Sequence, residues 1–182
     1  MGELATLQQI VKSKYGVATK LAWAKLTTKT TTTTENTITT DTFTGKKFIQ
    51  IMIHEFGGTG GDWGSIRFNE NTNSVYSQRY SRNGGADGTQ TSENNLVLDA
   101  SDETVDSFYI VYVCSITGQE KLTISSHVGF STAGAGTAPN RNEAVNKFVP
   151  SPDAEITQIR YDSANNNKTM LINSNISAIG TD

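Results

Sequence analysis

The sequence predicts an all-β protein, a single antiparallel β-sandwich of jelly-roll-like type with a short N-terminal helix or arm. From residue 21 onward, apolar residues recur with a period of two, in about eight to ten short runs. Turns rich in Gly, Asn and Asp separate these runs at regular spacing, which is typical of a sandwich. The long connections at 82–94 and 129–150 suit Greek-key or jelly-roll crossovers.

Length and charge restrict the function classes. A chain of 182 residues fits one domain, here divided into an N-terminal segment 1–20 and a sandwich 21–182. The net charge is -3 and no run of Lys or Arg forms a basic stripe, which argues against nucleic-acid binding. No apolar run approaches the length of a transmembrane helix, so no membrane insertion is expected. The single cysteine, Cys114, lies in an apolar run and is expected to be a buried, inert thiol.

Residues 3–14 form the only good helix candidate. Their apolar side chains recur at helical spacing, and Gly16 is a suitable stop. This short amphipathic helix either packs on its own domain or anchors the subunit to a neighbour. The residues expected to carry such assembly contacts are Leu4, Leu7, Ile10 and Val11.

The strands follow in order along the rest of the chain. Ile49, Ile51 and Ile53 mark the inner face of the run 46–56. The run 107–116 is apolar on both faces, which predicts a central strand covered on each side. The segment 138–148 is expected to be a helical turn laid across one end of the sandwich. The strands expected from the pattern are 21–28, 36–44, 46–56, 63–69, 74–81, 94–100, 107–116, 121–128, 154–162, 168–174 and 175–180.

No motif predicts catalysis or a cofactor. The glycines at 56–64 lack the Lys-Ser/Thr of a P-loop and precede a strand. His54 and Glu55 begin like a zinc-protease motif but have no second histidine three positions later, and in a strand they point to opposite faces. The same alternation separates Ser126 from His127, so no catalytic triad is expected there.

Two groups of polar and aromatic residues are candidates for binding a ligand. The acidic stretch holding Asp99, Asp102 and Asp106 is either a solvated loop or a calcium site, because clustered carboxylates suit a hard cation. A second group could stack sugar rings and bond hydroxyls, or fill the core or a subunit interface. Its members are Trp63, Tyr76, Arg79 and Tyr80.

Four segments together carry a resemblance to a known group of proteins. They are RFNENTNSVYSQRYSRNGGAD with the following GTQTS (67–92), GQEKLTIS (118–125) and STAGAGTAPNRNEAVNKF (131–148). In combination and order they resemble small β-sandwich virion structural proteins of tailed viruses, of phage or archaeal-virus type, found widely in marine environmental sequence. The resemblance covers roughly residues 36–182 and leaves out residues 1–20. It implies a tail-fibre-like or capsid-displayed protein and brings no catalytic residues with it.

The expected function is therefore a non-enzymatic subunit of a virion, assembled in the host cytoplasm and displayed on capsid or tail. Its expected partners are other virion proteins, reached through residues 1–20, and further copies of itself, with a host glycan as another candidate. One cysteine fits assembly in a reducing compartment. The alternative is a carbohydrate-binding module for host-glycan recognition. A hydrolase of surface polysaccharide would need a close carboxylate pair in a groove, for which the sequence offers no clear candidate.

Overall fold

The described part of the chain is all-β and consists of two antiparallel sheets. The computed structural model describes residues 22–57, 63–99, 106–130, 132, 134–150, 154–163 and 169–182. These residues contain twelve strands and no helix. The helix predicted at 3–14, with Leu4, Leu7, Ile10 and Val11, lies outside the described residues.

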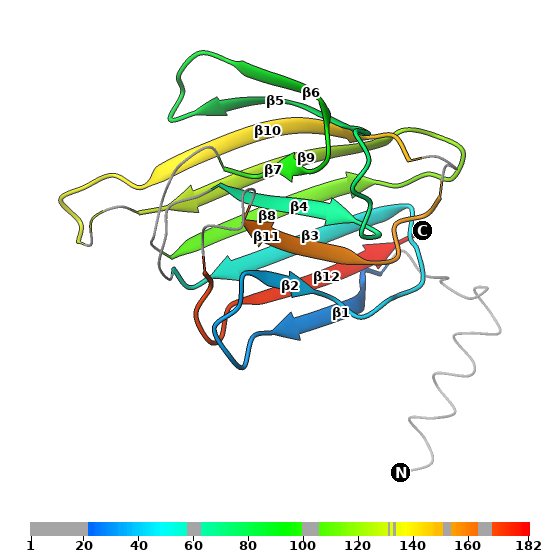
Figure 1. The fold of residues 1–182 in the computed structure, drawn as a ribbon, viewed down its shortest axis with the longest axis horizontal. Helices are drawn as coiled ribbons and strands as arrows, with labels where there is room; N and C mark the ends of the chain where they lie inside the picture. The colour runs from blue at the N-terminus through cyan, green and yellow to red at the C-terminus, as the bar shows by residue number, and fades with distance from the viewer. Residues whose placement is uncertain are drawn as a thin grey trace, which may run out of the picture.

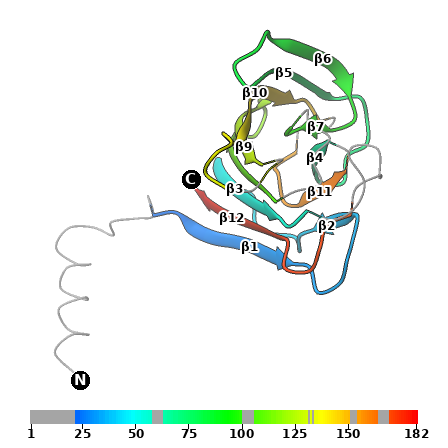
Figure 2. The same ribbon diagram turned by 90° about the vertical axis from the view of Figure 1, so that its left-hand side faces the viewer.

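The two sheets differ in size and pack face to face. In spatial order, the larger sheet contains β1 (Ala24–Thr30), β12 (Asn175–Thr181), β3 (Phe48–Glu55), β8 (Ser107–Cys114), β9 (Lys121–Gly129), β10 (Asn140–Phe148), β5 (Tyr76–Arg82) and β6 (Gly88–Glu93) (Figure 1). The smaller sheet contains β2 (Thr37–Thr39), β11 (Ile159–Ser163), β4 (Gly64–Phe68) and β7 (Leu96–Val97). Seen along the strands, β5 and β6 extend past the edge of the smaller sheet (Figure 2).

Both sheets contribute to one hydrophobic core. Ile49, Ile51 and Ile53 are fully buried on β3, as the period of two predicts. Ile66 and Phe68 of β4 belong to the same cluster. The core is closed by residues of β2, β5, β7, β8, β10, β11 and β12 and of neighbouring segments: Ile38, Tyr76, Leu96, Leu98, Tyr109, Val111, Val113, Phe148, Ile156, Ile159, Tyr161, Met170, Ile176 and Ala178.

The prediction for 138–148 is wrong, because this segment is a central strand. β10 pairs over its whole length with β9 and, from Asn142 to Phe148, with β5. Asn142, Ala144, Asn146 and Phe148 point inward while the residues between them are exposed. Asn, Glu and Lys are poor strand formers, so the local sequence gave a weak signal. Two neighbouring strands supply the hydrogen bonds that hold this segment extended.

Several other predicted boundaries also change. The predicted loop 82–94 contains β6, which pairs with β5. Among the described residues of the strand predicted at 168–174, Met170 forms isolated bridges to Glu35 and Gly57. The strand predicted at 154–162 begins late, at Ile159. In each case the partner strand, rather than the local pattern, determines which residues pair.

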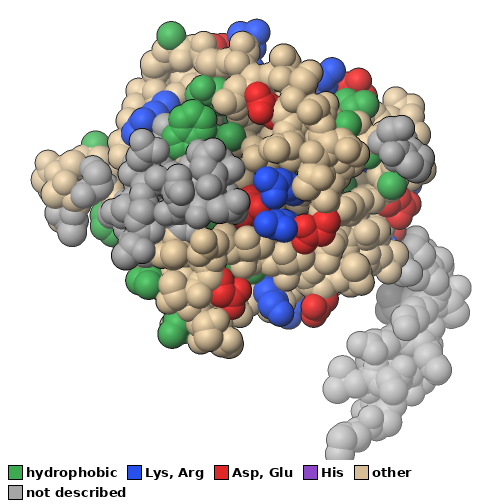
Figure 3. Space-filling view, in the orientation of Figure 1, with side chains coloured by type: hydrophobic (Ala, Val, Ile, Leu, Met, Phe, Trp, Pro, Cys, Tyr) green, Lys and Arg blue, Asp and Glu red, His purple; other side chains and the backbone are tan. Residues whose placement is uncertain are grey.

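The outer face of the smaller sheet is polar. Asp162 of β11 accepts hydrogen bonds from Ser65 Oγ (2.7 Å), Arg67 Nη1 (2.7 Å) and Arg160 Nε (2.8 Å). Arg160 Nη1 in turn lies 3.0 Å from Glu70 Oε2. Figure 3 shows this face, with cationic and acidic side chains side by side on a mostly uncharged polar surface.

Candidate functional site

The strand β9 buries most of its polar residues and exposes its apolar ones, and Ser126 is its one outward polar residue. Thr123, Ser125 and His127 are buried, together with Lys121 at the start of the strand. The residues between them alternate outward, and Ile124 is 61% exposed. A strand of a two-layer protein normally shows the opposite arrangement. The outer surface of the larger sheet is therefore a candidate functional surface.

Neighbouring strands extend this apolar surface on both sides of β9. The register places Gln50, Tyr112, Ile124 and Val145 in one row across β3, β8, β9 and β10. We define the outer apolar face as the outward apolar residues of these four strands: Phe48, Met52, Phe108, Ile110, Tyr112, Cys114, Leu122, Ile124, Val128 and Val145. Three of these residues are at least half exposed: Tyr112, Leu122 and Val145.

The most apolar hollow on this face has a volume of about 290 Å³. Phe48, Tyr112, Leu122 and Ile124 line it, and Trp23, just before β1, closes one side. Such a hollow offers burial to an apolar side chain and has almost no polar group to orient a polar ligand. It suits a protein partner better than a sugar.

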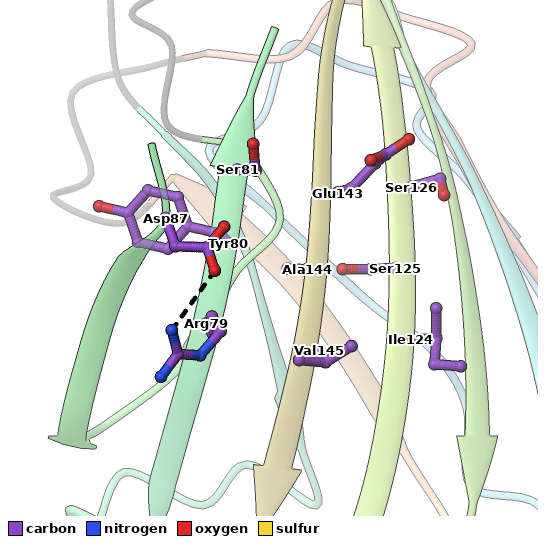
Figure 4. Close-up of a pocket in the computed structure, with 10 residues that line it drawn as sticks. All are labelled: Arg79, Tyr80, Ser81, Asp87, Ile124, Ser125, Ser126, Glu143, Ala144 and Val145. Carbon is purple, nitrogen blue, oxygen red and sulfur yellow. Dashed lines mark hydrogen bonds and ion pairs between the residues drawn. The ribbon is translucent and has the colours of Figure 1, made fainter. Parts of the chain in front are cut away.

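A second hollow, of about 360 Å³, lies between β5, β10 and β9 (Figure 4). Arg79, Val145 and Ile124 form one row of its floor, and Ser81, Glu143 and Ser126 form the next. Arg79 pairs with Asp87 at 3.3 Å. Charged residues thus begin where the outer apolar face ends.

Several of the buried polar residues of β9 and β10 are hydrogen-bonded in the interior. Asn146 Nδ2 donates to Thr123 Oγ1 at 2.8 Å and to Ser125 Oγ at 3.4 Å. Asn142 Nδ2 donates to the carbonyl oxygen of Leu98 at 2.9 Å. The side-chain oxygens of Asn142 and Asn146 are buried without a hydrogen-bond partner among the described residues, so these bonds offset only part of the cost of the reversed pattern of β9.

The four predicted ligand residues do not form one surface. Tyr76 is 1% exposed, and its ring stacks on Phe148 at 4.7 Å, so it belongs to the core. Arg79 is exposed on the outer side of β5. Tyr80 is half-buried, and its ring lies against Gly88, where an added Cβ would come within 2.5 Å of it. Trp63 is half-buried just before β4, a strand of the smaller sheet, whereas the other three belong to β5 of the larger sheet.

Of the three predicted calcium ligands, Asp99 and Asp106 accept hydrogen bonds from different parts of the chain. Asp99 is buried and accepts hydrogen bonds from Tyr109 Oη (2.5 Å) and from the amide of Gly64 (3.2 Å). Asp106 accepts a hydrogen bond from the amide of Gly57. Asp102 lies outside the described residues. Among the residues that the structure describes, no group of three or more His, Cys, Asp or Glu residues could hold a metal ion.

Sequence reasoning missed a buried cluster of acids and phenols around Asp99. Tyr161 Oη donates to Glu55 Oε2, and the hydroxyl oxygens of Tyr161 and Tyr109 lie 3.1 Å apart. Burial raises the pKa of both tyrosines well above the usual value, and the nearby carboxylates act in the same direction. Gly64 has no room for a side chain, because a Cβ would lie 2.5 Å from Tyr161 Oη. Hydrogen bonds hold both phenols inside the core.

The paired residues singled out for catalysis lie on opposite faces, as predicted. His54 points outward while Glu55 is buried. Ser126 points outward while His127 is buried and stacks on Tyr109 at 4.7 Å. Neither pair can act on one substrate from one side of the sheet.

Within the described part of the chain, the strand at 107–116 is covered on one side only, which corrects the prediction of cover on each side. Phe108 and Tyr112 are exposed, whereas Tyr109 and Val111 are fully buried. The sequence did contain a signal for the outer face, because Leu122, Ile124 and Val128 alternate with polar residues in 121–128. The sequence could not show which set of alternating residues faces inward, because that depends on where the other sheet packs.

Comparison with known protein families found no family that matches this chain, and comparison with curated proteins found no match. Nowhere in the described ranges is there a helix long and apolar enough to cross a membrane.

Proposed function

We propose that this protein is a non-enzymatic structural subunit that functions by assembling with other proteins. The observation that supports this most directly is the outer apolar face. Scattered surface apolar residues are ordinary, but a continuous apolar patch bordered by polar residues is typical of a protein interface. The face occupies the centre of the larger sheet and has charged residues along β10 and β5.

We further propose that the assembly is a virion, with the subunit displayed on capsid or tail. The strand order supports a jelly-roll sandwich, because β1-β12-β3-β8 and β2-β11-β4-β7 are the two four-stranded orders of that topology. The hairpin pairs β5–β6 and β9–β10 are then additions to the first sheet. Jelly rolls build viral capsids and also lectins, so the fold alone does not assign the function. The resemblance of segments 67–92, 118–125 and 131–148 to tailed-virus proteins favours the virion.

Mass spectrometry of purified particles tests the virion proposal. Particles produced by the virus that encodes this chain should contain it as a repeated component that withstands washing in high salt, because apolar contacts do not weaken with ionic strength. Antibody raised against the purified chain should label their surface. A chain that is abundant in infected cells but absent from purified particles contradicts the proposal.

Glycan recognition at the second hollow is the alternative function. Arg79, Asp87 and Glu143 supply charged hydrogen-bonding groups there, and Tyr80 lies at its margin. Binding on a glycan array that is lost in both Arg79→Ala and Tyr80→Ala would favour this alternative. Loss in Tyr80→Ala alone would not, since that ring also packs on Gly88.

A further inference from the structure

The outer apolar face is too wide for a single helix. Its apolar residues lie on β3, β8 and β9, with Val145 alone on β10, so it is about 14 Å wide at a strand spacing of about 4.8 Å. Along the strands it runs from the Phe48–Cys114–Leu122 row to the His54–Phe108–Val128 row, about 20 Å. A helix with its side chains is about 10 Å wide, so one helix would leave about a third of the face uncovered. A partner of sheet-like width fits it better.

The surface has the make-up of an interface between two folded subunits, an apolar centre continued by polar residues. A stable interface takes about 800 Å² of accessible surface from each partner, with an apolar centre and a polar border. The apolar centre measures on the order of 300 Å² in projection by the strand spacings above, and the polar border supplies the remaining area. Polar residues of β12, β5 and β6 continue the same sheet on both sides.

The charges at the border are already paired within one chain. Arg79 lies 3.3 Å from Asp87, Lys147 lies 3.5 Å from Glu120, and Arg141 lies 3.6 Å from Glu143. These pairs therefore give the border no excess of positive or negative charge. Such a border does not require an oppositely charged partner, and it does not repel an identical surface.

We infer that the partner on the outer apolar face is a second copy of this chain, packed face to face about a twofold axis. This inference rests on the proposed function, because it identifies the partner of the same surface. In such an interface the same patch serves both subunits. The two larger sheets would stack about 10 Å apart, as sheets do in sandwiches.

The single cysteine provides a test without any engineering. Cys114 is only partly buried, which corrects the prediction of a buried, inert thiol, and it lies on the outer apolar face beside Phe48 and Leu122. Its reaction with a small disulfide reagent should slow as protein concentration rises, because only the dissociated monomer exposes it. Slowing of about tenfold is expected where roughly a tenth of the chains remain monomeric. Sedimentation equilibrium at the same concentrations should show the mass doubling.

Two variants separate the outer face from the rest of the surface. Ile124→Lys should keep the mass at that of a monomer and the thiol reaction fast at every concentration. Thr39→Lys adds the same charge on the outer face of the smaller sheet and should behave like the unmodified chain. Far-ultraviolet circular dichroism identifies a variant that fails to fold, and Val145→Lys then takes the place of Ile124→Lys.

Three results would overturn the inference. A doubled mass with thiol reactivity independent of concentration places the dimer on another surface. If the protein is a monomer and its thiol reacts faster once residues 1–20 are deleted, that segment covers the face in place of a second copy. A monomer with a fast thiol reaction throughout leaves no second copy on the face, while the virion proposal stays open to the particle test.

Discussion

The two outer faces of this protein differ in whether the groups on them find their partners within one chain. On the smaller sheet every charged group of the Asp162 cluster finds its partner within the chain, through Ser65, Arg67 and Arg160. On the larger sheet Tyr112, Leu122 and Ile124 stay in contact with solvent. A few side chains of one chain can pair all the charges of a polar cluster. A broad apolar surface is removed from water only when another surface covers it. The polar face therefore contributes to the stability of the monomer, and the apolar face to association.

The same alternation of side chains builds both faces. On β11, Ile159 and Tyr161 point inward and Arg160 and Asp162 outward, the usual arrangement for a strand with one exposed side. On β9 most of the polar residues point inward. The comparison shows that a period of two specifies a strand without specifying which of its faces is inside.

The largest expected effect comes from removing the centre of the polar face. Asp162 is 0% exposed, so Asp162→Ala leaves Arg67 and Arg160 without their shared carboxylate. The free energy of unfolding should fall by about 3–5 kcal/mol, as for other buried pairs that lose one partner. Guanidinium denaturation measures this.

Glu70→Ala is the control for that variant. The Arg160–Glu70 pair is partly exposed, so its loss should cost less than about 1 kcal/mol. Equal losses in the two variants would mean that Asp162 does not act as the common partner of the two arginines.

An intermediate effect is expected from the buried phenols, which make the interior unusually polar. Tyr161→Phe removes the hydroxyl that donates to Glu55 and should cost about 1–3 kcal/mol at neutral pH. In the folded protein the pKa of Tyr161 is raised well above its usual value by burial, and that of Tyr109 likewise. The unfolded chain releases these protons near pH 10, so stability is intact below about pH 10 and falls as the pH rises further.

Denaturation at several alkaline pH values checks the second part of this prediction. Above about pH 10, the loss of stability per pH unit should be shallower in Tyr161→Phe by up to about 1.4 kcal/mol, because one proton fewer is released on unfolding. An identical slope in the two proteins would contradict the assignment of a buried, protonated phenol at this position.

The smallest effect on the monomer is expected on the outer apolar face. At concentrations too low for association, Ile124→Ala should change the free energy of unfolding by less than about 0.5 kcal/mol, since the side chain is 61% exposed. The matched variant Ile51→Ala, in the core on β3, should cost about 2–5 kcal/mol. A large monomer cost at Ile124 would show that the face is already covered within one chain.

Parts of the fold could be predicted because the local pattern was strong. Ile49, Ile51 and Ile53 alternate with less apolar residues, and β3 lies where that alternation indicates. β10 could not be predicted, because Asn142, Glu143 and Lys147 favour strands only when neighbours pair with them. The ligand prediction for Tyr76 failed for a similar reason: composition does not say which side of β5 faces Phe148.

The buried cluster of Glu55, Asp99, Tyr109 and Tyr161 shows the limit of sequence most clearly. These residues come from three strands and from a segment after β7, and nothing in their local sequence links them. Only the packing of the two sheets brings them within hydrogen-bonding distance.

By itself, the sequence determined that this protein is all-β, because alternation and turn residues are properties of neighbouring positions along the chain. The tertiary structure decided which parity of β8 and β9 faces the second sheet, and hence that Tyr112 and Ile124 are exposed while Tyr109 and His127 are buried. The physical reason is that a strand has two equivalent faces until another layer covers one of them. That choice left an apolar surface outside, on which the proposed assembly depends.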